Sequence, residues 1–234
     1  MPIDLYATRT CAPSVLVKMV AKHIGVDLNI KIVDMAKKEH LTPEFLKMNP
    51  YHKVPTMCDD GFVLFESTAI CLYLLNKYKP GSELYPKDVQ KRARVDQFMA
   101  IVTSCFQPRF SELFRSSLVL RKKPTAEQIK VVEDFALQGL EDMMGSSKFA
   151  VGDELTLADL TLVAHLGFMY KERLAFLTNE DKVYRKTVVF LTIASLLACP
   201  TTRRPTKNSS KGSPGVFKDR QVKTCGRTAY SCNK

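Results

Sequence analysis

The sequence lacks an apolar run long enough to cross a bilayer. Its longest such run, from Val188 to Cys199, is interrupted by Thr192 and Ser195 and is shorter than the roughly 20 residues that a membrane helix needs. The opening residues do not combine a basic segment with a long apolar run, so we expect no secretory signal. These two absences predict a cytoplasmic protein with no membrane partner. The 234 residues, 45% of them apolar, suffice for one large domain or two small ones.

Closely paired cysteines are also absent. The seven cysteines are an odd number, and none of them belongs to a C-x-x-C pair. Cys11, Cys58, Cys71 and Cys105 lie among apolar or helical residues. We therefore expect free thiols in a reducing compartment rather than a disulfide framework, and we expect no metal site.

The sequence also lacks the pattern of nucleic-acid-binding domains, in which basic residues on a folded face are interleaved with aromatic ones. The formal net charge is +11, but residues 200–234 hold nine Lys or Arg against one Asp and carry +8, which leaves +3 for the first 199 residues. Phe217 and Tyr230 are the only aromatic residues of this tail. We expect no nucleic-acid partner, and we expect the tail, which lacks apolar periodicity, to be disordered.

The first part of the chain, about eighty residues, alternates segments of strand type and helix type. Residues 3–6 and 28–33 are predicted strands, and residues 12–25 are a predicted helix with Pro13 in its first turn. A helix over residues 43–47, a hairpin and a last helix complete the sequence of elements. This order is typical of a thioredoxin-like α/β layer.

Pro80 and Gly81 mark a linker, after which the pattern changes to helical periodicity, beginning with residues 88–122. The sequence therefore predicts a fold of the class α/β plus all-α. We expect a thioredoxin-like N-terminal domain over residues 1–79 and a helical C-terminal domain over residues 87–199.

Three phenylalanines, Phe106, Phe110 and Phe114, share one face of the helix predicted over residues 88–122. Such a stripe belongs more often to the core than to a ligand pocket. Pro108 interrupts the same segment and is predicted to kink the helix or break it locally.

The stretch over residues 49–75 is the most informative part of the chain. Residues 53–57 are a short extended run, Asp60-Gly61 is a strong hairpin signal, and residues 62–65 are an apolar strand of core type. The pattern predicts a hairpin that leads directly into a helix.

Glu66 and Ser67 open that helix. The unpaired backbone N–H groups of a helix start favour a carboxylate, and Glu66 can receive an ammonium group, so the pair suits an α-amino-acid head. Pro55 removes a ladder donor and indicates an edge strand or a cis bond. A bound peptide could pair with the Val54 backbone like an added strand.

The strings N-P-Y-H-K-V-P-T-M and D-G-F-V-L-F-E-S-T-A-I-C-x-Y-L in this stretch resemble the glutathione-binding half of cytosolic glutathione transferases, most closely the insect delta and epsilon classes. The resemblance implies glutathione as co-substrate and a homodimer. It also implies a cis Val54-Pro55 peptide, with Val54 pairing to the cysteinyl part of glutathione. The γ-glutamyl head would lie at Glu66, Ser67 and Thr68. The glycyl carboxylate would lie near His52 and Lys53.

A second string, V-G-D-E-L-T-L-A-D-L, is shared with the same family, where it lies at a buried helix start. Thr156 and Asp159 have the spacing of a capping box, with Asp in place of the usual Glu. In this family the helix that carries the three phenylalanines lines the site for the apolar substrate, so the stripe could serve the core and that site together.

The sequence departs from the family at Cys11. Cys11 lies two positions before Pro13. In the delta and epsilon classes the residue at this position is a Ser that donates a hydrogen bond to the glutathione sulfur. An S–H group is a weak donor. Thr10, Ser14 and Tyr6 remain as alternative hydroxyl donors. Cys11 could instead form a mixed disulfide itself, or be a small buried residue without a role.

Three functions remain open on this reading. The first is a glutathione transferase that conjugates reduced glutathione to small apolar electrophiles in detoxification. The second is a glutathione-dependent thiol-disulfide reductase that uses Cys11. The third is a non-catalytic protein that binds glutathione or apolar ligands.

Overall fold

The structure is a computed structural model of the chain, and it describes residues 2–9, 11–114, 122 and 125–171. The predicted tail over residues 200–234 lies outside the described residues. The same holds for the end of the helical domain predicted over residues 87–199, beyond Lys171.

The N-terminal part of the chain forms one mixed four-stranded sheet with the strand order β2-β1-β3-β4. β1 is parallel to β2, whereas β1 with β3 and β3 with β4 are antiparallel. Asp60 and Gly61, between β3 and β4, both have positive φ, as a tight two-residue hairpin requires. The strands are β1 (Ile3–Ala7), β2 (Leu28–Ile32), β3 (Thr56–Asp59) and β4 (Phe62–Phe65).

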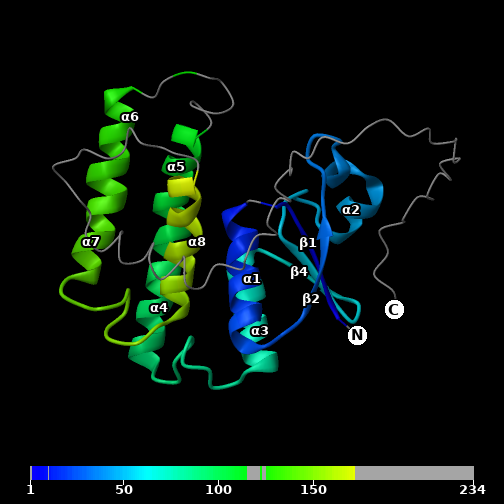
Figure 1. Cartoon of the computed structure of the whole chain (residues 1–234), viewed down its shortest axis with the longest axis horizontal. Coiled ribbons are helices and arrows are strands. Elements are labelled where there is room, and N and C mark those ends of the chain that lie inside the picture. Colours follow the sequence, from blue (N-terminus) through cyan, green and yellow to red (C-terminus); the bar gives the residue numbers. More distant parts are fainter. Residues whose placement is uncertain (1, 10, 115–121, 123–124, 172–234) are drawn as a thin grey trace, which may run out of the picture.

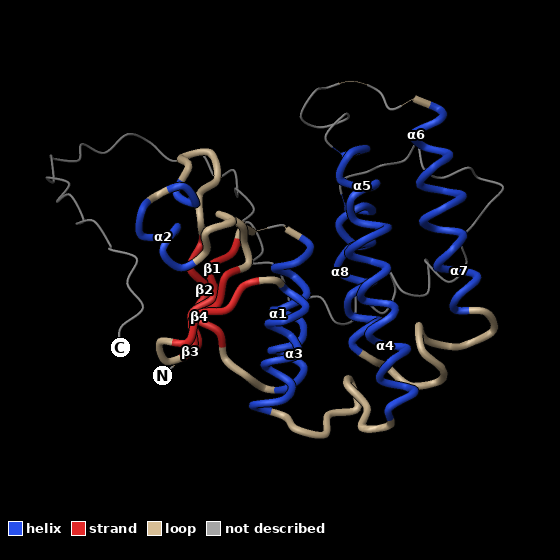
Figure 2. The backbone as a smooth tube through the Cα atoms, turned by 180° about the vertical axis from the view of Figure 1, so that it is seen from behind, coloured by secondary structure: helices blue, strands red, loops and turns tan. Residues whose placement is uncertain are grey.

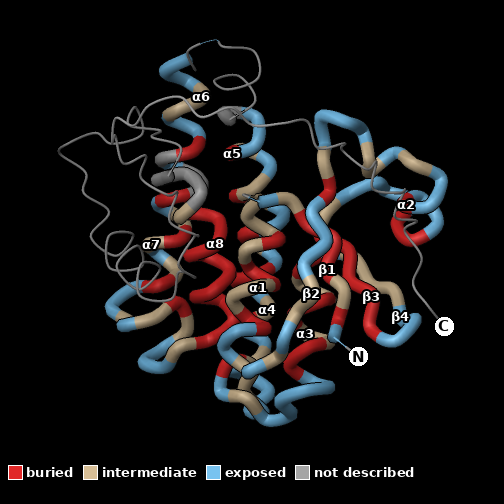
Figure 3. The backbone as a smooth tube through the Cα atoms, turned by 45° about the vertical axis from the view of Figure 1, so that its right-hand side comes forward, coloured by how far each residue is buried: buried red, intermediate tan, exposed pale blue. Residues whose placement is uncertain are grey.

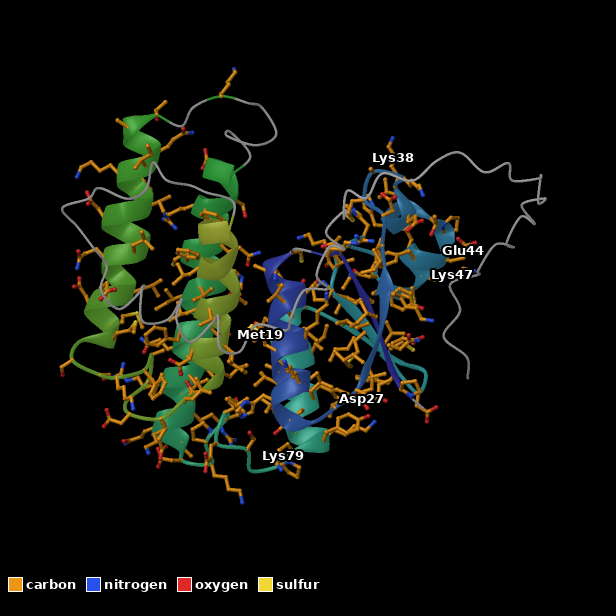
Figure 4. The ribbon with its side chains drawn as sticks, in the orientation of Figure 1. Met19, Asp27, Lys38, Glu44, Lys47 and Lys79 are labelled. Atoms are coloured by element: carbon orange, nitrogen blue, oxygen red, sulfur yellow. The ribbon has the colours of Figure 1, made fainter. Side chains whose placement is uncertain are left out.

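Helices cover both faces of this sheet, which confirms the thioredoxin-like layer. In Figure 1, α1 (Ala12–Ile24) and α3 (Ser67–Tyr78) lie on the face toward the helical domain, and α2 (Pro43–Met48) lies on the other face. A short 3-10 helix, Glu39–Leu41, precedes α2. Figure 4 shows Lys38, Glu44 and Lys47 around α2, on the side of the sheet away from α1.

Strand β1 is buried on both faces because its side chains alternate between two cores. Ile3 and Leu5 belong to the large core that extends into the helices. Tyr6 belongs to a small core under α2, where its ring meets Phe45 edge-on at 6.2 Å between centroids. Strand β4 corrects one expectation: it is an edge strand whose side chains are half-buried or exposed, because only β3 pairs with it.

The second part of the described chain is helical, as predicted (Figure 2). The prediction of a disturbed helix at Pro108 takes a specific form: the helix widens into a π-helical segment directly before Pro108 and then continues. A proline ring clashes with the carbonyl group four residues earlier, and a wider turn relieves this clash. The elements are α4 (Val89–Ile101), a π segment (Val102–Phe106), α5 (Gln107–Phe114), α6 (Ala126–Val131), a second π segment (Val132–Leu137), α7 (Gln138–Met144) and α8 (Leu157–Lys171).

Helix α8 is the centre of the helical part and packs against α1 and α4. Its residues from Leu157 to Leu166 are all buried, as Figure 3 shows, which is typical of a helix that is apolar on every side. His165 is buried with them. Its Nδ1 lies 2.8 Å from the carbonyl oxygen of Thr161 and therefore carries the proton, while burial lowers the pKa of the ring.

The cysteines follow the expectation of free thiols only in part. Among the described residues Cys11, Cys71 and Cys105 are free, whereas Cys58 is disulfide-bonded, so the expectation is wrong for Cys58. Cys71 is fully buried in α3, and this burial raises the pKa of its thiol. Of the helices described, none combines the length and the apolar character needed to cross a membrane.

The carboxylate of Asp159 holds the start of α8 in place. It is fully buried and accepts hydrogen bonds from the backbone N–H of Ala150 at 2.6 Å, from the N–H of Thr156 at 2.7 Å and from the Thr156 hydroxyl at 2.9 Å. In a standard capping box the Thr hydroxyl would accept a hydrogen bond from the backbone N–H of Asp159. Here the Thr156 hydroxyl instead donates to the Asp159 carboxylate. Burial raises the pKa of Asp159, and these hydrogen bonds oppose that shift.

Replacing Asp159 by Asn should lower the free energy of unfolding by about 2 kcal/mol. The amide keeps the size of the side chain but has only one acceptor oxygen, so buried donors of Ala150 or Thr156 lose their partner. Urea denaturation followed by circular dichroism measures the change. Asp153→Asn, in the exposed part of the same loop, is the matched control and should stay within about 0.5 kcal/mol of the parent. Equal effects of the two changes would contradict this role of Asp159.

Candidate functional site

A pocket of about 360 Å³ lies between the N-terminal layer and the helical part. Both parts of the chain line it. The lining residues are Pro13, Asn49, Lys53, Val54, Pro55, Glu66, Ser67, Thr68, Thr103, Gln107, Pro108 and Ser111.

The loop that enters β3 forms the floor of this pocket and is held from below by Asn49. Asn49 is 1% exposed. Its Nδ2 donates to the carbonyl oxygen of Lys53 at 2.9 Å and to Thr56 Oγ1 at 3.0 Å, while its Oδ1 accepts from the N–H of Tyr51 at 3.0 Å. A second bond, from the Thr56 hydroxyl to the same Lys53 carbonyl, is 3.0 Å long. These bonds fix the backbone just before Val54.

The Val54-Pro55 peptide bond is cis, as the family resemblance implied. Both residues line the pocket, with Pro55 buried and Val54 half-buried. Val54 lies two residues before the inner strand β3 and outside the sheet, in which β3 is paired on both sides by β1 and β4. Its backbone is therefore the part of this loop that can pair with an extended ligand in the pocket.

The start of α3 forms the second side of the pocket. Glu66, at the N-cap, makes no side-chain hydrogen bond to the helix, and the first backbone bond of the helix runs from Ile70 N–H to the Glu66 carbonyl at 2.9 Å. The N–H groups of Ser67 and Thr68 therefore precede the first helical hydrogen bond. They point out of the positive end of a 12-residue helix.

The backbone of Glu66 has φ of 68° and ψ of 111°, a conformation that residues other than glycine adopt rarely. The chain bends there from β4 into α3. Glu66 is exposed at the pocket while Ser67 is 9% exposed beneath it. The bend thus sets a carboxylate beside free N–H groups, and this pair of charges fits the carboxylate and ammonium of one amino-acid head.

Cys11 is the N-cap residue of α1, and its side chain does not cap the helix. Its Sγ lies 3.1 Å from Ser14 Oγ and 3.9 Å from the carbonyl oxygen of Val54. Ser14 is fully buried, so its hydroxyl lies behind Cys11 and does not face the pocket. Cys11 is half-buried beside two lining residues, Pro13 and Val54.

Tyr6, another predicted hydroxyl donor, does not border the pocket. Tyr6 is 2% exposed in the core under α2, where burial, helped by Asp4, raises the pKa of its hydroxyl. Thr10 lies outside the described residues. Of the three candidates that the structure describes, Cys11 lies beside the lining, Ser14 is buried behind it and Tyr6 lies in the core under α2.

His52 and Lys53, which the family resemblance places near the glycyl carboxylate of glutathione, are both exposed. Lys53 lines the pocket. His52 does not, and its backbone has φ of 47°. The His52 ring lies 6.2 Å from the ring of His40 between centroids. Among the described residues, no cluster of three or more His, Cys, Asp or Glu side chains is arranged to hold a metal ion.

Phe106 and Phe110 of the phenylalanine stripe do not line the pocket. Phe106 and Phe110 are 1% and 7% exposed in the large core, with their rings stacked at 5.9 Å between centroids. The side chain of Phe114 lies outside what the structure describes. Neither Phe106 nor Phe110 lines the pocket, so the structure gives this pair a place in the core.

The residues of this helix that do line the pocket were not predicted from the sequence. Thr103, Gln107 and Ser111 recur at four-residue steps and so share a face, with Pro108 beside them. The sequence does contain a signal for these lining residues, because they form a polar stripe at helical spacing beside the phenylalanine stripe. Asn49 was likewise not identified, because its buried bonds depend on where the loop folds back.

Family models match both parts of the chain. The model of the glutathione S-transferase N-terminal domain matches residues 1–76, and the model of the glutathione S-transferase C-terminal domain matches residues 95–188.

Solved structures of insect transferases resemble the chain over most of its length. A delta-class glutathione transferase of Nilaparvata lugens is 34% identical, with 84% of this chain and 100% of that chain covered and a TM-score of 0.67. An epsilon-class glutathione S-transferase of the housefly, Musca domestica, is 31% identical, with 85% and 88% covered and a TM-score of 0.73. A glutathione transferase of Bombyx mori is also 31% identical, with 84% and 96% covered and a TM-score of 0.69.

Replacing Ser67 by Ala should weaken glutathione binding by about 1–3 kcal/mol, because a charge-assisted hydrogen bond to a carboxylate is lost at the start of α3. Isothermal titration calorimetry with reduced glutathione measures the affinity, and thermal unfolding confirms that the variant is folded. Ser146→Ala, an exposed serine that does not line the pocket, is the control. An unchanged affinity of Ser67→Ala would remove Ser67 from the binding site.

Proposed function

Since the chain belongs to the glutathione S-transferase family, we propose that it joins the sulfur of reduced glutathione to small apolar electrophiles, as a detoxifying enzyme of the cytoplasm. Glutathione is the co-substrate of this family. The observation that carries the finer proposal is the pocket of about 360 Å³ between the two parts of the chain. Its lining combines Val54, Glu66 and Ser67 of the N-terminal layer with Thr103, Gln107, Pro108 and Ser111 of the helical part.

The binding mode that we propose assigns each part of glutathione to one side of the pocket. The γ-glutamyl carboxylate binds the N–H groups and hydroxyls of Ser67 and Thr68, and its ammonium binds Glu66. The cysteinyl backbone pairs with Val54, whose position the Asn49 bonds fix. The glycyl carboxylate lies toward Lys53 and His52, which are exposed. Of all the lining residues, the two with charged side chains, Lys53 and Glu66, then both act on glutathione.

Conjugation requires the glutathione thiol to ionise near neutral pH. A free thiol has a pKa of about 8.5, and lowering it by about two units corresponds to about 2.7 kcal/mol. In the proposed pose the sulfur lies near the start of α1, whose positive end favours a thiolate. Cys11 contributes a weak S–H donor at that position. Electrophiles then react with a glutathione thiolate that is stabilised more by the start of α1 than by the Cys11 side chain.

One contact favours a second candidate function, glutathione-dependent disulfide reduction at Cys11. The buried Ser14 hydroxyl lies 3.1 Å from Cys11 Sγ and can donate to a Cys11 thiolate at the start of α1. That thiolate attacks the glutathionyl sulfur of a mixed disulfide, the S–S bond breaks, and the other sulfur leaves as a thiolate. A second glutathione thiolate then attacks the Cys11 adduct, which releases oxidised glutathione and restores Cys11.

We further propose that two copies of the chain associate through the face that holds α3 and α4. The proposal rests on family resemblance, and the exposed Phe62, Tyr78 and Val89 on and beside these elements supply apolar area for it. Sedimentation equilibrium should give about twice the mass of one chain. A monomer at micromolar concentration would contradict the proposal.

Replacing Cys11 by Ser tests how the site acts. If the enzyme conjugates glutathione with a weak S–H donor beside the sulfur, the hydroxyl should raise kcat/KM with 1-chloro-2,4-dinitrobenzene by up to about tenfold, or about 1.4 kcal/mol. If Cys11 is the nucleophile, the same change should abolish the reduction of a mixed disulfide with glutathione, because an unactivated Ser cannot form a disulfide with the glutathionyl sulfur.

Cys105→Ser is the matched control, since Cys105 is also a free, half-buried thiol but does not line the pocket. It should leave both activities unchanged. Mass spectrometry after incubation with oxidised glutathione should find an adduct on Cys11 if the reductase function holds. A parent protein that binds glutathione but shows neither activity would overturn both enzymatic proposals and favour a binding role.

A further inference from the structure

Helix α8 carries a histidine in its apolar interior. His165 is 4% exposed, although both nitrogen atoms of an imidazole ring form hydrogen bonds. Every residue from Leu157 to Leu166 is buried, and the apolar ones among them belong to the large core. The surroundings of the two ring nitrogens therefore decide which protonation state the folded chain can hold.

One nitrogen of this ring has a partner within the same helix. His165 Nδ1 lies 2.8 Å from the carbonyl oxygen of Thr161, one turn earlier, and it must donate because a carbonyl oxygen only accepts. The Thr161 hydroxyl repeats this arrangement and donates to the carbonyl oxygen of Leu157 at 2.8 Å. The polar side chains along this line of the helix thus bond to the backbone of α8 itself.

The other nitrogen of the ring has no such partner. His165 Nε2 is buried and makes no hydrogen bond to any residue that the structure describes. In the neutral ring with its proton on Nδ1, Nε2 carries a lone pair and leaves one acceptor unsatisfied. In the protonated ring Nε2 becomes a charged N–H donor, and an unpaired charge in an apolar interior costs far more than an unpaired acceptor. The packed helix therefore accommodates the neutral ring but not the imidazolium.

The elements packed against α8 do not supply a carboxylate for an imidazolium. α1 and α4 make the main contacts with α8. Their charged or titratable side chains are Lys18, Lys22 and His23 of α1 and Lys91, Arg92, Arg94 and Asp96 of α4. Asp96, the single acidic residue among them, accepts a hydrogen bond from the Tyr85 hydroxyl at 3.1 Å. The remaining groups of this set are basic, and a positive charge disfavours a second one nearby.

The described carboxylate of α8 is also engaged elsewhere. Asp159 lies about 9 Å from His165 along the helix axis. It accepts hydrogen bonds from Ala150 and Thr156 at the start of the helix. A proton on His165 Nε2 would therefore meet no acceptor among the described side chains of α8, and the packing has to open to let water reach it.

The charge state of His165 links the stability of the fold to pH. Burial lowers the pKa of the ring, and the hydrogen bond to the Thr161 carbonyl opposes this shift. In an unfolded chain the pKa of a histidine is about 6.5. The unfolded chain therefore binds this proton at a higher pH than the folded chain does. The stability contributed by the neutral ring is fully present above about pH 6.5 and is lost as the pH falls below it.

We propose that His165 is an acid-sensitive switch between α8 and α1, in which protonation of Nε2 opens the packing of these two helices. Figure 4 shows Met19 of α1 on the side of that helix that faces α8. The opening reaches the pocket, because α1 carries Pro13 of the lining and has Cys11 as its N-cap. The inference does not depend on which reaction the pocket performs.

The tautomer and the charge of His165 can be observed directly. Long-range ¹H–¹⁵N correlation spectra of the full chain with ¹⁵N-labelled histidine report on the rings of its four histidines. His165 should carry its proton on Nδ1 at pH 7.5 and should stay neutral at pH 5.5 for as long as the chain is folded. A proton on Nε2 at pH 7.5, or uptake of a second proton by the folded chain with a midpoint near pH 6.5, would overturn the proposal.

Urea denaturation at pH 7.5 and at pH 5.5 measures the effect on stability. One proton that only the unfolded chain binds should raise the unfolding equilibrium constant about tenfold between these two values, in addition to any change from other groups. His165→Gln and His165→Leu keep a similar volume without a titratable ring and should each lack this tenfold part. If one replacement does not fold, the other still decides, and the spectra of the parent chain require neither.

His23→Gln is the matched control, because His23 is an exposed histidine in the last turn of α1. It should keep the acid effect of the parent chain. An equal pH dependence in the parent and in the His165 variants would overturn the role of His165.

Hydrogen exchange at pH 5.5 locates the opening. The amides of α8 and α1 should exchange faster in the parent chain than in His165→Gln, whereas those of strand β1 should differ less. Equal acceleration in β1 would indicate unfolding of the whole chain and would overturn a switch between the two helices.

Discussion

The unpaired backbone N–H groups at the start of α3 are the constraint around which this site is built. A helix must leave its first N–H groups without intrahelical partners, and Glu66, the N-cap residue, makes no side-chain bond to them. Their position follows from the sheet, because β4 runs into α3 through the bend at Glu66 with φ of 68°. The resulting positive end faces a pocket and favours a carboxylate there.

The other parts of the N-terminal layer bring a loop to the same pocket as that helix end. Asn49, with three hydrogen bonds and 1% exposure, holds the loop before Val54, and the cis Val54-Pro55 bond lies in the pocket lining. The start of α1 adds a second positive helix end, occupied by Cys11 with Ser14 behind it. Two helix starts and one loop therefore border the N-terminal side of the pocket, together with the side chains of Lys53 and Glu66.

The helical part completes the pocket with a different chemistry. Pro108 is accommodated by a π-helical segment before it, and the same stretch supplies Thr103, Gln107 and Ser111 to the lining. The start of α8, held by the buried Asp159, packs this domain against α1. The polarity of this side of the pocket is therefore set by which face of the helical stretch borders it.

The sequence by itself determined the sheet and helix order, the Asp60-Gly61 hairpin and the helix start at Ser67, because local backbone preferences and apolar periodicity decide these features. It also placed Glu66, Ser67 and Val54 in one stretch, and the pocket contains all three. Only the tertiary structure decided which side of the α5 helix meets the pocket. Two stripes, one of phenylalanines and one of Thr103, Gln107 and Ser111, run along that helix, and packing places Phe106 and Phe110 in the core. The edge position of β4 and the approach of Cys11 to the Val54 carbonyl, residues 43 apart in the chain, were also decided by the tertiary structure. The Asn49 anchor spans only a few residues, but it needs a loop that folds back on itself, and periodicity does not reveal such a loop.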